Sequence, residues 1–138
     1  MTIYAVIDTN VFVSAMLSRN NSAATVMLVD KMFKGEFVPV YSADTMKEYT
    51  EVLHRDKFHF NSHRLSILLE MILQYGLMLE PSPTGEILPD VKDIPFYEVV
   101  MEERKSEDAY LVTGNQKHFP VRPFIVTPKE MLDILDRR

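Results

Sequence analysis

Asp8 is the first residue of this chain whose type and position indicate chemistry. It directly follows the apolar run at residues 3–7 and opens a segment with helical character. A buried strand that ends on a carboxylate and turns into a helix presents that acid at the carboxyl edge of a sheet, where α/β folds place their ligands. Asp8 is therefore the first candidate for a catalytic or ligand role. The simpler alternative is a cap at the start of the helix.

Three further places carry polar groups that could meet Asp8 at the same edge of the sheet. Glu48 lies within a predicted helix, Asp93 precedes another helix, and Asn115 follows a predicted strand. Carboxylates from distant parts of a chain repel one another unless a hard divalent cation joins them, and Mg²⁺ and Mn²⁺ take oxygen ligands of this kind. The pattern predicts a site for Mg²⁺ or Mn²⁺ that suits phosphodiester hydrolysis.

The acids after Asp8 have rivals nearby. Glu51 lies one helical turn beyond Glu48, and Asp90 precedes Asp93, so either could be the ligand instead. Glu48 could also be a solvated helix residue, and Asp93 only a cap. We favour Glu48 and Asp93 as ligands. Asp108 begins a predicted strand, which places it at the opposite edge of the sheet from the site.

The sequence around these residues alternates between strand and helix patterns. Apolar runs predict strands over residues 3–7, 37–41, 77–80, 109–113 and 124–126. Helical periodicity and capping residues predict helices over about residues 11–17, 22–33, 43–53, 62–75, 95–104 and from 128 onward. Strands separated by helices predict an α/β fold with a mainly parallel sheet and right-handed crossovers. Pro39 indicates that its strand lies at an edge, or that the proline stands at the strand start.

Length and composition narrow the class of protein. A chain of 138 residues has the usual length of one domain, so we expect residues 1–138 to form a single domain. The absence of cysteine excludes disulfides and thiolate metal sites. Neither a signal peptide nor an apolar run of about 18 residues is present, so we expect a cytoplasmic protein without a membrane span. The net charge of −5 argues against nucleic-acid binding by a general basic surface.

Four motifs, in this order, resemble the PIN domain family of metal-dependent ribonucleases. They are Val6–Val11, Glu48–Leu53, Asp93–Phe96 and Leu111–Asn115. The resemblance covers almost the whole chain and is closest to the branch of toxins from toxin–antitoxin systems. It implies a three-layer α/β/α fold with four or five strands, bound Mg²⁺ or Mn²⁺, and cleavage of RNA. It also implies a small antitoxin protein as a partner and suggests a homodimer.

Asn115 departs from the family pattern, because many relatives carry an aspartate at this position. An amide oxygen can still orient a metal-bound water, but it adds no negative charge. We therefore expect one tightly bound ion, held by Asp8, Glu48 and Asp93. Polar neighbours could hold these carboxylates in place by hydrogen bonds: Thr9, Asn10 and Thr113. The alternative is a PIN-like module with weak or no catalysis that binds RNA or protein.

Basic residues near the predicted site are candidates for RNA contacts. They are Arg55, Lys57, Lys117 and His118. Phe58 and Phe60 lie beside the first two, and cations next to aromatic rings could contact phosphates and stack on unpaired bases. A solvated loop and an exposed turn are equally simple interpretations. Apolar side chains of helices 22–33 and 62–75 are most simply core, although exposed ones could form a dimer interface.

Overall fold

The computed structural model describes residues 1–138, which form an α/β structure around a five-stranded sheet. The strands are β1 (Tyr4–Ile7), β2 (Val38–Tyr41), β3 (Leu77–Met78), β4 (Ala109–Val112) and β5 (Ile125–Val126). The α-helices are α1 (Thr9–Leu17), α2 (Ala24–Phe33), α3 (Ala43–Leu53), α4 (Ser62–Tyr75), α5 (Ile94–Glu103) and α6 (Pro128–Arg137), and three short 3₁₀ segments are η1 (Asp56–Phe58), η2 (Val91–Asp93) and η3 (Gln116–His118). Every strand pair is parallel. The predicted α/β/α fold with a parallel sheet is confirmed.

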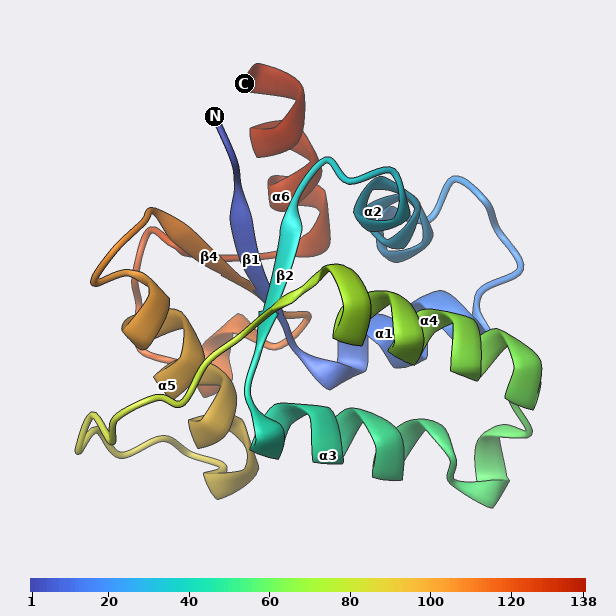
Figure 1. The fold of residues 1–138 in the computed structure, drawn as a ribbon, viewed down its shortest axis with the longest axis horizontal. Coiled ribbons are helices and arrows are strands. Elements are labelled where there is room, and N and C mark those ends of the chain that lie inside the picture. Colours follow the sequence, from blue (N-terminus) through green and yellow to red (C-terminus); the bar gives the residue numbers. More distant parts are fainter.

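The order of the strands reverses at the centre of the sheet. The order is β3-β2-β1-β4-β5, so the chain builds outward from β1 through β2 to β3 and then crosses back to β4. With right-handed crossovers, the helices before and after this reversal cover opposite faces. Figure 1 shows α5 on one side of the strands and α1, α2, α4 and α6 on the other. Ligand sites in such sheets lie outside the carboxyl ends of the strands where the order reverses, here β1 and β4.

The core surrounds the two central strands and fixes α3 against them. Ala5 and Val6 of β1 and Ala109, Leu111 and Val112 of β4 are almost fully buried, as expected for a parallel sheet covered on both faces. The ring of Tyr49 in α3 packs edge-on against Phe12, with centroids 5.0 Å apart. Its hydroxyl donates a 2.5 Å hydrogen bond to the carbonyl of Ile7. This bond joins α3 to the last residue of β1, directly before Asp8.

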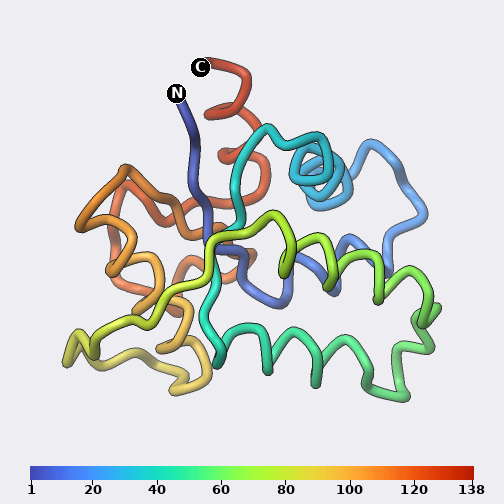
Figure 2. Tube along the Cα trace, in the orientation of Figure 1, coloured from blue at the N-terminus to red at the C-terminus, as the bar shows by residue number.

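The two termini lie together at the amino edge of the sheet. Figure 2 shows the two ends of the tube next to each other, and Met1 and Arg138 line the same shallow cavity of about 300 Å³. Asp108 lines that cavity too, so it lies at the amino edge as expected. None of the helices combines the length and the apolar composition that a bilayer crossing requires.

The structure corrects the limits of three predicted elements. Helix α1 begins at Thr9, not near residue 11, because β1 turns into the helix without a linker. Helix α2 begins at Ala24, since the side chain of Asn20 accepts a 2.9 Å hydrogen bond from the backbone of Ser22 and holds the preceding residues in a turn. Strand β3 contains only two of the four predicted residues, 77–80.

Of the two alternatives predicted for Pro39, the edge strand is wrong, because β2 lies inside the sheet, whereas a position near the strand start is correct. Strand β2 pairs with β1 on one side and β3 on the other. Pro39 nevertheless faces only one partner, because it is in register with Ala5 of β1 while β3 pairs only with Val40 and Tyr41. Near the strand start, its missing N–H therefore interrupts no pairing with β3.

Candidate functional site

Asp8 lies at the carboxyl end of β1, where it is 5% exposed. It occupies the cap position of α1, but its side chain makes no capping hydrogen bond. Two side chains donate to its Oδ2 atom, Thr113 Oγ1 at 2.8 Å and Asn10 Nδ2 at 3.2 Å. Because both donors bind Oδ2, Oδ1 has no side-chain donor. This arrangement favours a ligand role for Asp8 over a simple helix cap.

The turn after β4 is joined to Asp8 by a chain of hydrogen bonds. The backbone N–H of Asn115 donates to Thr113 Oγ1 at 3.0 Å, and that hydroxyl donates onward to Asp8. The backbone N–H of Gly114 donates to Asn10 Oδ1 at 3.3 Å. Thr113 is fully buried, whereas Asn115 is exposed and its side chain makes no hydrogen bond within the protein. The turn thus fixes the orientation of Thr113 and Asn10 toward the carboxylate.

Glu48 reaches the site from α3. The start of this helix is set by a capping box, in which Ser42 Oγ accepts from the Thr45 backbone at 3.2 Å and Thr45 Oγ1 accepts from the Ser42 backbone at 2.9 Å. Glu48 is half-buried, and its Oε2 accepts a 2.5 Å hydrogen bond from Thr9 Oγ1. Glu51 is exposed and takes part in no hydrogen bond or ion pair through its side chain. The structure therefore places Glu48, not Glu51, beside the end of β1.

Asp93 stands directly before α5, with Pro95 in the first turn of that helix. Its side chain is 15% exposed, and its Oδ2 atom is buried without a hydrogen-bond partner. His118 Nδ1 lies 3.4 Å from this oxygen, close enough for an ionic contact when the ring is protonated. Asp90 is exposed, and its side chain accepts a 2.9 Å hydrogen bond from the Lys92 backbone. Asp93 is thus the acid of this segment that faces the site.

The acids of the site repel one another electrostatically. Burial, with smaller contributions from the charges of Asp93 and Glu48, raises the pKa of Asp8 from 3.8 to about 6, against the opposing hydrogen bond from Thr113. Burial, then Asp90 and Glu48, also raise the pKa of Asp93, while His118 lowers it. No Lys or Arg forms an ion pair with Asp8, Glu48 or Asp93. The three carboxylates therefore lie within one another's field without a compensating basic residue.

The carboxylates do not converge on a single point. Nowhere in the structure do three acidic or histidine side chains come close enough to coordinate one ion together, which differs from the ligand set expected from the sequence. Glu48 turns to Thr9 and Asp93 to His118, as mutual repulsion favours. The donor set still fits a hard divalent cation, because it consists of carboxylate oxygens from three elements and includes the orphaned Oδ2 of Asp93.

The sequence did not predict the structural roles of two residues at the site. His118 was predicted to contact RNA, but its ring faces Asp93. Tyr49 lies within the predicted helix 43–53 with no functional role predicted for it, yet its hydroxyl anchors α3 to β1. Both contacts join residues 25 or more positions apart, and no local pattern signals them. Arg55 and Lys57 follow the end of α3 and are exposed, as is Lys117.

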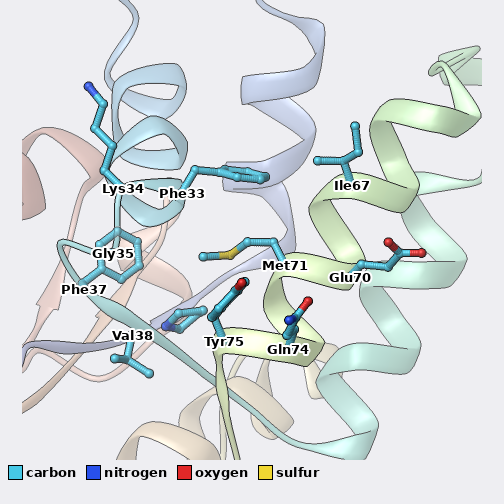
Figure 3. Close-up of a pocket in the computed structure, with 11 residues that line it drawn as sticks. Phe33, Lys34, Gly35, Phe37, Val38, Ile67, Glu70, Met71, Gln74 and Tyr75 are labelled. Atoms are coloured by element: carbon cyan, nitrogen blue, oxygen red, sulfur yellow. The ribbon is translucent and has the colours of Figure 1, made fainter.

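The main apolar cavity lies away from the carboxylates. It has a volume of about 600 Å³ and is bounded by the end of α2, the start of β2 and α4. Figure 3 shows Phe33 of α2 and Met71 of α4 reaching into the space between the two helices, while Lys34 points away. A second apolar cavity of about 230 Å³ also contains Phe33. None of the three acids lines either cavity, so the chemistry of the site does not take place there.

Comparison with known proteins gives one match. The model of the PIN domain family matches residues 4–117. This range includes the three carboxylates and the turn at Asn115, and it ends before β5 and α6. No curated protein and no solved structure matches the chain.

Proposed function

Because the chain belongs to the PIN domain family, whose members are generally nucleases that use divalent metal ions, we propose that it is a metal-dependent endoribonuclease. Family membership supports a nuclease-type hydrolase, and the choice of RNA as substrate and of Mg²⁺ or Mn²⁺ as the ion is our proposal. The observation that carries it is that Asp8, Glu48 and Asp93 lie within one another's electrostatic influence around the sheet's reversal point, although they do not converge on one point. The only basic side chain in an ion pair with any of them is the weakly basic His118.

In this proposal, Asp8, Glu48 and Asp93 hold a single ion. When bound, Mg²⁺ or Mn²⁺ supplies Lewis acidity, which lowers the pKa of an attacking water and stabilises charge on the phosphate. Asn115 adds no negative charge, so a second ion would be held less firmly.

The residues around the acids orient them. Thr113 and Asn10 hold Asp8 through Oδ2, and Thr9 holds Glu48, so these carboxylates have restricted rotamers before a substrate arrives. The amide of Asn115, in the turn bonded to Asp8, can orient an attacking water. Lys117 is exposed in the same turn and can contact a substrate phosphate.

We further propose that the enzyme is the toxin of a toxin–antitoxin pair, acts in the cytoplasm as a homodimer and is inhibited by a small antitoxin protein. The likeness of its motifs to the toxin branch supports this role, and the apolar cavity between α2 and α4 offers a surface for a protein partner. Expression of the wild-type chain should arrest bacterial growth, whereas expression of Asp8→Asn should not. Equal growth of both strains, at matched protein levels, would contradict the toxin role.

The nuclease itself is tested by cleavage of an unstructured, end-labelled RNA. Wild type and Asp8→Asn are compared with Mn²⁺, with Mg²⁺ and with EDTA. We expect cleavage that needs a metal ion and disappears in the variant. A folded wild-type protein that cuts with neither ion would favour the alternative of a PIN-like binding module, in which Asn115 marks the loss of catalysis.

A further inference from the structure

The connection between α3 and α4, residues 54–64, gathers positive charge that has no partner in the protein. We call this segment the basic–aromatic junction. It contains one acid, Asp56, against the basic residues Arg55, Lys57 and Arg64 and the histidines His54, His59 and His63. Its arginines and lysine form no ion pair, as is true of several other basic residues of the chain. What distinguishes the junction is that these cations are close together in the sequence with a single acid among them. In a chain of net charge −5, such a patch attracts anions locally.

Two aromatic rings lie within this charge. Phe58 and Phe60 stack with centroids 5.0 Å apart and an interplanar angle of 7°. Phe60 packs against the core, and Phe58 is half-buried, so part of its ring stays accessible. Lys57 Nζ lies 5.1 Å from the centroid of the Phe58 ring. The same few residues therefore offer a pair of stacked aromatic rings and a cation over one of them.

The backbone of the junction is fixed by its own hydrogen bonds. The N–H of Phe58 donates to the carbonyl of Arg55 at 3.1 Å, and that of His59 donates to Asp56 at 3.2 Å. His59 has a φ of 53°, and it is the only residue other than glycine with positive φ. The side chain of Asn61 then caps α4 by accepting from the Arg64 backbone at 3.1 Å. Fixed backbone geometry lowers the entropic cost of binding a ligand here.

The junction is connected to the carboxylates by α3. Glu48 lies five residues before the end of α3 and Arg55 two residues after it, so the second half of this helix spans the distance between the acid and the junction. Figure 1 shows α3 running from the end of β2 to the junction. A nucleic-acid strand with one phosphate at the acids could therefore place a neighbouring nucleotide at the junction.

We propose that the basic–aromatic junction binds single-stranded RNA beside the phosphate to be cut, with an unpaired base stacked on Phe58 and neighbouring phosphates contacting Arg55 and Lys57. The inference rests on the proposed ribonuclease function for its substrate class. A base in a duplex is already stacked on both faces, so an exposed ring selects unpaired nucleotides. Cations alone would bind duplex RNA as well.

The test measures binding without cleavage. Fluorescence anisotropy with a labelled single-stranded RNA and a duplex of equal length is recorded in EDTA, where binding does not depend on catalysis. We expect the single strand to bind at least about tenfold more tightly than the duplex. The double variant Arg55→Ala, Lys57→Ala should weaken single-strand binding about tenfold and reduce the slope of log K against log salt by about 1.4, or 0.7 for each lost phosphate contact.

Two further variants separate this site from general charge effects. The control variant Lys105→Ala, Arg137→Ala removes two positive charges, as the junction variant does, but at the amino edge of the sheet. Its RNA affinity should stay within about twofold of wild type, because a lost cation matters little unless it touches the RNA. Phe58→Leu keeps an apolar side chain of similar size, and it should weaken single-strand binding several-fold without changing the salt slope. Thermal unfolding confirms that each variant is folded.

Equal affinity of the protein for duplex and single-stranded RNA would overturn the inference, as would equal losses of affinity in the junction and control variants. A wild-type protein that binds no RNA would also overturn it, and is the result expected if the junction instead binds an acidic protein. Failure of the proposed nuclease function gives a different result. A protein that binds single-stranded RNA through the junction, but does not cut it with Mg²⁺ or Mn²⁺, would retain this site and lose the catalytic proposal.

Discussion

Helix α3 and the loop after it carry opposite charges in opposite settings. In the middle of the helix, Glu48 is half-buried and hydrogen-bonded to Thr9. It lies beside Asp8 and Asp93, whose burial and neighbouring charges raise their pKa. After the end of α3, Arg55 and Lys57 are exposed and unpaired. Ionisation of the buried acids lowers the free energy of unfolding, whereas surface cations change it little. Stability measurements should therefore respond to changes in the acids, and binding measurements to changes in the basic residues.

The largest effect should come from removing the charge at Glu48. Glu48→Gln should lower metal-dependent RNA cleavage at least about a hundredfold, because an amide is a poor ligand for a hard cation. Glu51→Gln is the matched control, since Glu51 is exposed one turn further along the same helix. It should keep activity within about twofold of wild type, because it removes the same charge without a ligand. Equal losses in rate would show that α3 carries no specific ligand at Glu48.

The stability of the metal-free protein should rise when Asp8 becomes neutral. The pKa of Asp8 is raised from 3.8 to about 6 in the folded state, so its ionisation destabilises the fold at neutral pH. This penalty is absent below about pH 4 and grows as the pH rises from about 4 to 6. Asp8→Asn in EDTA should therefore be more stable than wild type by roughly 3 kcal/mol at pH 7.5, at 1.36 kcal/mol per pKa unit.

This stability gain is measured by urea unfolding at pH 7.5 and pH 4. The difference between the two proteins should shrink toward zero at the lower pH, where both side chains are neutral. A variant that is less stable than wild type at pH 7.5 would mean that Asp8 stabilises the fold, as a structural cap would.

A smaller effect is expected on turnover from the basic residues after α3. Arg55→Ala with Lys57→Ala should raise KM for single-stranded RNA about tenfold and leave kcat within about twofold, because the junction binds substrate and transition state alike. Steady-state cleavage over a range of RNA concentrations separates the two constants. A fall in kcat with unchanged KM would assign these residues to the chemical step and remove the distinction between the acids and the basic residues after α3.

The smallest effect should follow from restoring an acid at position 115. Asn115→Asp adds a fourth carboxylate to the site, in the turn that is hydrogen-bonded to Asp8. Metal affinity should rise several-fold, because another anionic oxygen can join the ligand set. Calorimetric titration with Mn²⁺ measures this change. Unchanged affinity would show that the side chain at this position does not reach the ion.

The sequence predicts those features of the fold and site that depend on local position. Asp8 and Thr113 follow strands that point to the same edge, and parallel topology brings them together. The sequence does not reveal side-chain direction across the fold, which decides that His118 faces Asp93 and that Tyr49 bonds to Ile7. The position of Pro39 inside the sheet also depends on tertiary structure, because only the short β3 leaves the proline unpaired on one side.

The central claim is that Asp8, Glu48 and Asp93 together bind one divalent ion, and direct Mn²⁺ binding tests it most simply. Electron paramagnetic resonance of free Mn²⁺, titrated with wild type, Glu48→Gln and Glu51→Gln, separates binding from catalysis. We predict one site in wild type and Glu51→Gln, and its loss or severe weakening in Glu48→Gln. Binding of Mn²⁺ with equal affinity by all three proteins, or no binding by wild type, would contradict the account.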